Sequence, residues 1–289
     1  MLFAPEIASR ARARLLAAPR AGPDQRADDY DLPVARFCAA EIERRAEPLV
    51  LGINGPQGAG KSTLAERLVL ALTECGLRAV AVSIDDFYLT HDAQQLLARS
   101  YPQNPYLEHR GYPGTHDVAL GERVVADLLD GGTITIPVYD KSAHGGRGDR
   151  APTSTWRRVH GPFDAVILEG WMLGFRPVPD ETLEDRFLIP PNRMLAEYAR
   201  WHRFLGAFVH LEARSLEDIV GWRIDAEQAR QARGAAALSD AEARDYIERF
   251  LPAYRLYVPP LRSQPWLKAT LHIPLGRDRM PSSGIAALG

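Results

Sequence analysis

Residues 55–62 read GPQGAGKS and constrain the fold of this chain more than any other segment. They fit the pattern G-x-x-x-x-G-K-[S/T], follow the short apolar run 49–54 and precede the helical periodicity of 62–74. Glycines at these positions let backbone N–H groups turn inward around phosphate oxygens, and the helix N-terminus adds positive potential. The segment therefore predicts a phosphate-binding loop between a buried strand and a helix.

The last side chains of this loop have distinct predicted roles. Lys61 is expected to bridge the β- and γ-phosphates of ATP, Ser62 to ligate Mg²⁺ and Thr63 to contact the α-phosphate. A glycine-rich turn that matches by chance is the alternative, but a chain of this composition yields roughly 0.001 such matches. The residues assigned to the nucleotide are Gly55, Pro56, Gln57, Gly58, Ala59, Gly60, Lys61, Ser62 and Thr63.

Expected strands alternate with expected helices along the rest of the chain. This alternation indicates an α/β P-loop NTPase fold, with a doubly wound, mainly parallel sheet flanked by helices and ligands at the carboxyl ends of the strands. Residues 1–47 are expected to form a helical N-terminal extension. Strands are expected at 49–54, 78–84, 133–138, 165–168, 207–211 and 269–273, and helices at 62–74, 91–100, 117–129, 193–204, 215–230 and 239–257.

Composition excludes several classes of function. A formal charge of −2 over 289 residues provides no basic surface for nucleic acid and no polybasic patch for a membrane. Cys38 and Cys75 belong to no disulfide or zinc-binding pattern. No stretch approaches the ~18 apolar residues of a membrane span, and residues 1–14 lack an apolar signal-peptide core. We therefore expect a cytoplasmic protein whose partner is a small molecule.

Two carboxylates follow the second expected strand, in the segment SIDDFY at 83–88. In a doubly wound sheet this position adjoins the phosphate loop, so a carboxylate here can accept the proton of an attacking hydroxyl. Asp85 is our choice for that base, and Asp86 is expected to organise water around Mg²⁺. A solvated Asp-Asp turn at a strand end is the alternative.

A third carboxylate ends the apolar strand expected at 165–168. Glu169 stands where P-loop enzymes carry the acidic residue that holds a Mg²⁺-bound water, with Glu in place of Asp. A structural carboxylate at the sheet edge is the alternative. The predicted metal site therefore consists of Ser62, Asp86 and Glu169.

Charge-dense loops supply candidates for binding an anionic acceptor. In the loop 139–150, Arg147 and Arg150 can hold a carboxylate through paired hydrogen bonds, whereas Lys141 offers a point charge. A solvated loop and, in the preceding segment, helix capping by Thr115 or Asp117 are the alternatives. The residues assigned to the acceptor are Asp85, Tyr88, Arg110, His116, Tyr139, Lys141, Arg147 and Arg150.

Arg223 is the third expected catalytic residue, beside Lys61 and Asp85. It lies on the helix expected at 215–230, and a mobile lid at this place can deliver positive charge to the transferring phosphoryl group. The alternative is a solvated surface arginine, because arginine is abundant in this chain.

These segments together resemble the D-glycerate 3-kinases, in the broader P-loop group of phosphoribulokinase, uridine kinase and pantothenate kinase. The resemblance runs from about 48 to 281. In the related kinases the region around 215–235 is similar to a lid, so the chain is interpreted as a kinase domain at 48–289 behind the extension. The segments that carry the resemblance are GPQGAGKSTL at 55–64, SIDDFYLT at 83–90, RGYPGTHD at 110–117, YDKSAHGGRGDR at 139–150, LEGWMLGF at 168–175, WRIDAEQARQ at 222–231 and RFLPAYRLY at 249–257.

The resemblance implies an ATP- and Mg²⁺-dependent phosphotransferase that converts D-glycerate to 3-phosphoglycerate. A related kinase for uridine, pantothenate or a ribulose phosphate is one alternative. A regulatory P-loop ATPase that switches a partner is another, and it predicts slow hydrolysis of ATP without any acceptor. The charged loops at 110–117 and 139–150 favour a kinase over that ATPase.

Overall fold

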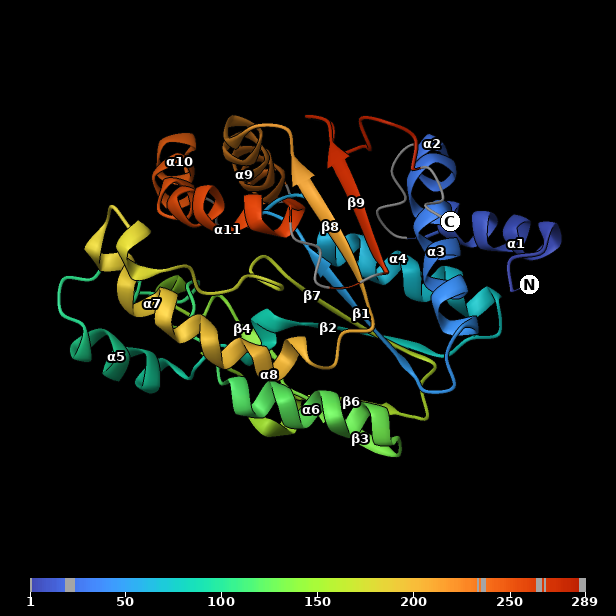
Figure 1. Cartoon of the computed structure of the whole chain (residues 1–289), viewed down its shortest axis with the longest axis horizontal. Coiled ribbons are helices and arrows are strands. Elements are labelled where there is room, and N and C mark those ends of the chain that lie inside the picture. Colours follow the sequence, from blue (N-terminus) through green and yellow to red (C-terminus); the bar gives the residue numbers. More distant parts are fainter. Residues whose placement is uncertain are drawn as a thin grey trace.

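The computed structural model describes residues 2–18, 24–232, 234, 238–263, 267 and 269–285. A five-stranded sheet crosses the molecule, and helices cover both of its faces (Figure 1). All of its neighbouring strands are parallel, in the order β2-β7-β1-β8-β9, which confirms the predicted doubly wound sheet. The strands are β1 (Leu49–Asn54), β2 (Ala79–Ser83), β7 (Ala165–Gly170), β8 (Ala207–Ala213) and β9 (Thr270–Leu275).

Alternate side chains of the central strands pack into two apolar cores, one on each face of the sheet. In β1, Val50 joins the core that also contains Trp201 and Phe250, whereas Leu51 and Ile53 join the opposite core. Every residue of β1 and β7 is buried, as expected for strands that are covered on both faces. The buried sheet therefore fixes the strand ends from which the functional loops leave.

Eleven α-helices are described, and the first of them pack against the helix that follows the phosphate loop. Arg67 in α4 donates to Asp31 at 2.6 Å, and both side chains are almost fully buried beneath the N-terminal helices. The helices are α1 (Pro5–Leu16), α2 (Asp24–Arg26), α3 (Leu32–Glu43), α4 (Lys61–Glu74), α5 (His91–Ser100), α6 (Val118–Asp130), α7 (Ile189–Met194), α8 (Ala199–His202), α9 (Leu216–Gln231), α10 (Asp240–Glu248) and α11 (Leu251–Ser263).

Three predicted elements differ from the structure. The strand expected at 133–138 forms β3 (Thr133–Ile136), which pairs antiparallel with β6 (Arg157–His160) outside the main sheet. Its alternation of exposed and buried residues suits a sheet with one wet face. The helix expected at 239–257 is divided into α10 and α11, because Pro252 cannot continue an α-helical ladder and instead lies in the first turn of the second helix.

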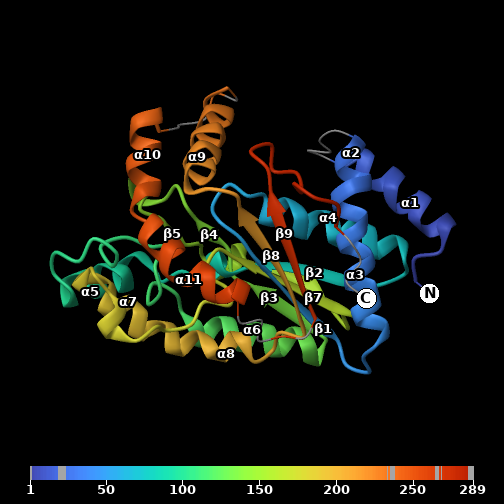
Figure 2. The same cartoon turned by 45° about the horizontal axis from the view of Figure 1, so that its top comes forward.

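The helix expected at 193–204 is also divided, into α7, a 3₁₀ turn and α8. A second small sheet pairs β4 (Tyr139–Asp140) with β5 (Asp149–Arg150) and closes the charged loop between them. Figure 2 shows α9 and α10 standing side by side above the carboxyl ends of the central strands. Within the described residues, no helix combines the length and apolar character that crossing a bilayer requires.

Candidate active site

The phosphate loop needs glycine at position 58 for two reasons. Gly58 has φ of +82°, in the left-handed region that favours glycine, and an added Cβ would lie 2.8 Å from the Cβ of Trp222. Gly60, with φ of +89°, turns the chain into α4. The backbone of residues 55–62 thereby wraps back over the end of β1, as the sequence pattern predicts.

Side chains from distant segments brace this loop. The backbone N–H of Gln57 donates to the Tyr254 hydroxyl at 3.1 Å, and Arg279 Nε donates to the Gly58 carbonyl at 2.8 Å. Lys61 Nζ donates to the Pro56 carbonyl at 3.1 Å, so its ammonium already lies inside the turn. Tyr254 and Arg279 are functional candidates that sequence reasoning missed, because only the fold brings them to the loop.

Glu169 lies directly beside the phosphate loop. It ends β7, is 4% exposed and accepts a hydrogen bond from Ser62 Oγ at 2.7 Å. The parallel register that places Ile53 opposite Glu169 produces this contact, because the loop begins just after β1. A carboxylate oxygen and a hydroxyl oxygen at this separation are hard donors of the kind that Mg²⁺ takes, so these residues fit the ion.

Asp85 forms an ion pair with Lys141, whose Nζ lies 2.5 Å from Asp85 Oδ2. Burial alone would raise the pKa of Asp85, but the charge and hydrogen bond of Lys141 outweigh it and lower the pKa to about 2. Burial lowers the pKa of Lys61, and the negative charges of Glu169 and Asp85 partly offset this effect. The two carboxylates and two lysines therefore form one electrostatically coupled group.

Asp86 has the opposite electrostatic character from its neighbour. Burial, followed by the charge of Asp85, raises the pKa of Asp86 to about 6. Two adjacent carboxylates cannot both ionise easily when one cation neutralises only the first. The pKa values of the two aspartates therefore differ in the structure, whereas the sequence alone does not show which of them is the base.

An aromatic wall lies next to Asp85. The rings of Tyr88 and His116 stack with centroids 4.2 Å apart, and Tyr139 meets Tyr88 edge-on at 5.3 Å. His116 is 5% exposed, and its Nδ1 lies 2.8 Å from the Tyr198 hydroxyl, whereas no described residue bonds its Nε2. Burial lowers the pKa of His116 to about 3, so a neutral imidazole faces the site.

The three arginines predicted to hold the acceptor lie in different surroundings. Arg110 donates to the carbonyls of Lys141, Gly146 and Arg147, and so supports the loop that carries Lys141. Arg150 donates to the Tyr88 carbonyl at 3.0 Å. The side chain of Arg147 is exposed to solvent.

The segment before α6 shows that Asp117 does cap a helix. Its Oδ1 accepts a hydrogen bond from the Leu120 N–H at 2.9 Å, and its Oδ2 lies 3.4 Å from Arg150. This is the alternative considered for Asp117, and it leaves His116 as the acceptor candidate of that segment.

Arg223 projects from α9 toward α10. Its guanidinium lies 4.4 Å from the centroid of the Tyr246 ring, and its Nη2 lies 2.5 Å from Glu227 Oε1. Its Nε is buried and has no partner among the described residues. Arg223 is therefore held between the two helices above the sheet, and Tyr246 is a further residue that the sequence did not single out.

Comparisons with known proteins show which family this chain resembles. The model of the phosphoribulokinase/uridine kinase family matches residues 50–178. The chloroplastic D-glycerate 3-kinase of Arabidopsis thaliana is 37% identical over 251 residues, which are 81% of this chain, and the match spans 55% of that relative's length. An uncharacterised kinase of Schizosaccharomyces pombe is 36% identical over 263 residues, 86% of this chain and 95% of its own.

A solved structure shares most of this architecture. The D-glycerate 3-kinase from Cryptococcus neoformans superposes with a TM-score of 0.80 at 31% sequence identity. The match covers 88% of this chain and 97% of that one. The similarity therefore extends over most of both chains.

Proposed function

This chain belongs to the D-glycerate 3-kinase family of P-loop kinases, and from this premise we propose that it transfers the γ-phosphoryl group of ATP to the C3 hydroxyl of D-glycerate. As a member it is a phosphotransferase with an alcohol group as acceptor. One observation supports the proposal above the others. A carboxylate and a lysine, Asp85 and Lys141, pair at 2.5 Å beside the half-buried Lys61 of the phosphate loop.

In the proposed reaction, Asp85 orients the C3 hydroxyl and accepts its proton as the oxygen attacks phosphorus. Lys141 leaves Asp85 when glycerate arrives and pairs with the substrate carboxylate instead, so the base is freed at the moment when it is needed. Lys61 and Arg223 supply positive charge where negative charge develops on the phosphoryl oxygens. Tyr88 and His116 form the wall that excludes water from the acceptor.

We further propose that Ser62 and Glu169 hold Mg²⁺, with Asp86 oriented toward its water shell. The ion would neutralise phosphate charge in the transition state. The 2.7 Å contact between the Ser62 hydroxyl and Glu169 supports this assignment. Glu169 keeps its carboxylate orientation through that hydroxyl, so the site is prepared before the nucleotide arrives.

The domain boundaries, the lid, the location and the partner belong to the same proposal. Residues 48–289 form the kinase domain, and the helix that carries Arg223 acts as its lid around 215–235, of which residues 233 and 235 lie outside the described part of the chain. Residues 1–47 form an extension whose helices pack on α4, as the Arg67–Asp31 pair supports. The cytoplasm is the proposed location, and glycerate rather than nucleic acid or a membrane is the proposed partner.

An acceptor panel tests the substrate. Purified protein with ATP and Mg²⁺ is offered D-glycerate, uridine, pantothenate and ribulose 5-phosphate in turn, and formation of ADP is measured. We expect turnover with D-glycerate, with the product phosphorylated at C3 by ³¹P NMR. Turnover with another acceptor alone would overturn the glycerate assignment, and equal ADP release without any acceptor would favour the regulatory ATPase.

A further inference from the structure

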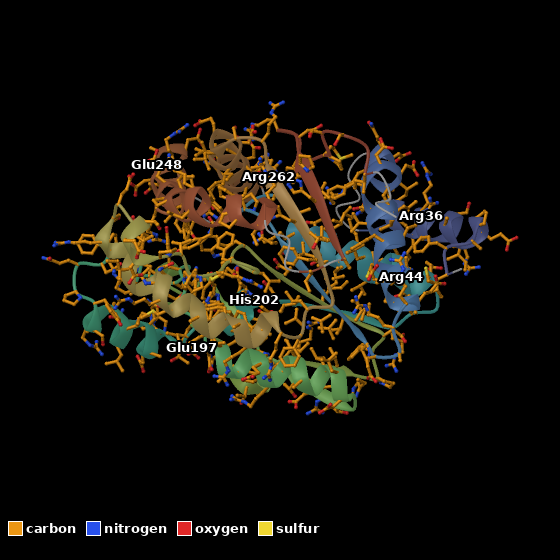
Figure 3. All side chains as sticks on the ribbon, in the orientation of Figure 1. Arg36, Arg44, Glu197, His202, Glu248 and Arg262 are labelled. Carbon is orange, nitrogen blue, oxygen red and sulfur yellow. The ribbon has the colours of Figure 1, made fainter. Side chains whose placement is uncertain are left out.

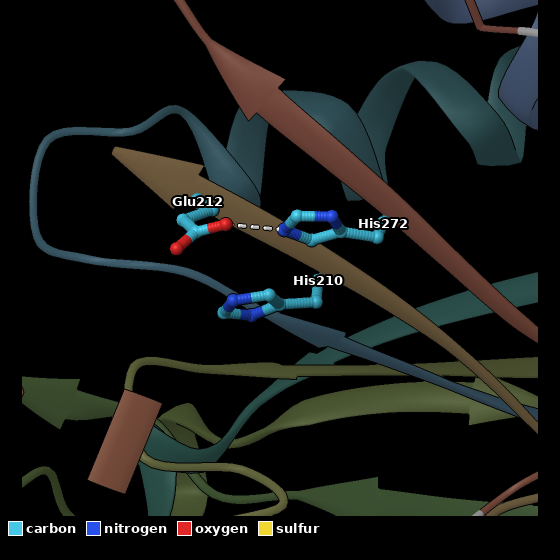
Figure 4. Close-up of side chains that lie close together, drawn as sticks. All are labelled: His210, Glu212 and His272. Carbon is cyan, nitrogen blue, oxygen red and sulfur yellow. Dashed lines mark hydrogen bonds and ion pairs between the residues drawn. The ribbon is translucent and has the colours of Figure 1, made fainter. Parts of the chain in front are cut away.

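A second cluster of metal-ligating side chains lies on the other side of β1, outside the proposed active site. His210 and Glu212 on β8 and His272 on β9 each offer one ligand atom, and these atoms lie within 4.8 Å of one another (Figure 4). The register pairs His210 with His272, and Glu212 follows two residues later on the same face of β8. Two adjacent rigid strands therefore hold the three groups together.

Hydrogen-bond accounting fixes which nitrogen of His210 carries its proton. The Asn54 amide nitrogen donates to the carbonyls of Trp171 and Leu173, so the Asn54 oxygen remains as an acceptor. His210 Nδ1 lies 2.8 Å from that oxygen and must donate to it. The proton therefore resides on Nδ1, and Nε2 presents a lone pair.

No described residue donates a hydrogen bond to the Nε2 lone pair of His210. The residue is 3% exposed, and no described residue bonds its Nε2. A buried acceptor without a partner is costly, and a metal ion satisfies it directly. The Asn54 oxygen also matches the usual outer partner of a metal-bound imidazole, whose other N–H donates to a fixed acceptor.

Glu212 has other partners in this structure. His272 Nε2 lies 2.5 Å from Glu212 Oε2 (Figure 4). Arg262, labelled in Figure 3 at the end of α11, donates to Glu212 Oε1. The Arg262 side chain is 62% exposed, so it can turn into solvent and release the carboxylate. A neutral His272 can likewise move its proton to Nδ1 and present Nε2 as a ligand.

We propose that His210, Glu212 and His272 bind a divalent transition-metal ion of the Zn²⁺ class. Two imidazoles and one carboxylate are a ligand set that Zn²⁺ and its neighbours accept, and they leave a position open for water. A cavity of about 190 Å³, lined by His210, Glu212 and Asn54 among others, adjoins the cluster and provides room for that water. The ion would join edge strand β9 to β8.

Zinc binding by the full-length, untagged protein tests this proposal. Isothermal titration with Zn²⁺, in buffer that contains excess Mg²⁺ to occupy the oxygen ligands of the proposed active site, should give one site. His272→Gln removes an exposed ligand and should weaken this site by at least about 100-fold, whereas the matched control His160→Gln on β6 should bind as the wild type does. Circular dichroism verifies that each variant is folded.

A second variant separates a metal site from a plain ion-pair network. Arg262→Gln leaves the three ligands in place and removes the competing cation, so it should tighten Zn²⁺ binding about tenfold. Thermal unfolding should show a higher Tm with Zn²⁺ in the wild type and no such rise in His272→Gln. Absence of a zinc site in both the wild type and Arg262→Gln, or equal binding by wild type and His272→Gln, would overturn the proposal.

Discussion

Glu169 and Glu212 lie on the two strands that flank β1, but at different levels and on opposite faces of the sheet. Ile53 of β1 lies opposite Glu169 on β7 and opposite Val209 on β8, so Glu212 comes three residues further along its strand. Both are nearly buried, at 4% and 8% exposed, and both lie near the carboxyl end of a parallel strand. Glu169 faces the phosphate loop and accepts from Ser62, whereas Glu212 faces α11 and β9 and pairs with Arg262 and His272.

The difference between these carboxylates comes from the face of the sheet on which each one lies and from the elements packed against that face. On the β7 side the neighbours are hydroxyl and ammonium groups suited to phosphate and Mg²⁺. On the β8 side they are imidazoles, which suit softer ions. A parallel sheet thus offers several buried carboxylates at one edge, and the elements packed against each one determine its chemistry.

If the β7 side carries the phosphoryl transfer, Asp85→Asn should have the largest effect. We expect kcat to fall by about 10²- to 10⁴-fold while the KM for ATP stays nearly constant, because the amide cannot accept the proton. Steady-state kinetics with D-glycerate provide the measurement. Wild-type kcat in this variant would remove Asp85 from the role of base.

Replacing Glu169 on β7 and Glu212 on β8, one at a time, by glutamine compares the two strands directly. Glu169→Gln should lower kcat by about 10²- to 10³-fold, because a neutral amide holds Mg²⁺ poorly and stabilises less transition-state charge. Glu212→Gln should lower kcat by less than about fivefold, since its partners lie on α11 and β9. Equal losses in the two variants would contradict the division of roles drawn above.

Lys141→Met is expected to act mainly on the acceptor. Loss of one charge-assisted hydrogen bond should raise the KM for D-glycerate by about 10- to 100-fold and change the KM for ATP far less. It should also raise the pKa of Asp85 from about 2, because the cation that lowers it is gone. ¹³C NMR titration of the carboxyl groups detects that change, and an unaltered pKa would show that the ion pair is absent in solution.

The smallest expected effect concerns stability. The pKa of Asp86 is raised to about 6, so the folded chain keeps a proton that the unfolded chain releases near pH 4. This contribution to the free energy of unfolding is present below about pH 4 and is lost as the pH rises through 6.

Asp86→Asn removes that loss and should raise the free energy of unfolding at pH 7.5 by about 1–2 kcal/mol relative to the wild type. Urea denaturation at pH 4 and pH 7.5 measures it, with exposed Glu184→Gln as the control. An unchanged difference between the two pH values would contradict the raised pKa.

Much of the fold could be predicted because the central strands are apolar throughout and the loop 55–62 has a defined place between strand and helix. The strand expected at 133–138 was assigned to no particular sheet, since its pairing with β6 depends on a partner that carries little apolar signal. The break between α10 and α11 had a visible cause in Pro252, which the periodicity of 239–257 obscured.

The residues of the site likewise fall into those that local motifs indicate and those that only the fold brings together. The predictions for Lys61, Ser62, Asp85 and Glu169 rest on contiguous motifs at strand ends, and the structure brings these four side chains together. The contacts of Tyr254 and His272 depend on register and helix packing, which no local pattern encodes. The assignments of Arg110, Arg147 and Arg150 to the acceptor remain predictions.

The pairing of Asp85 with Lys141 has a consequence for the idle enzyme. With Asp85 as the base proposed above, its negative charge is occupied by Lys141 whenever the acceptor is missing. A carboxylate in that condition is a poor activator of a stray water molecule, so a nucleotide bound alone is spared from futile hydrolysis. Lys141 would then keep Asp85 inactive as a base until an anionic acceptor binds and takes over the lysine.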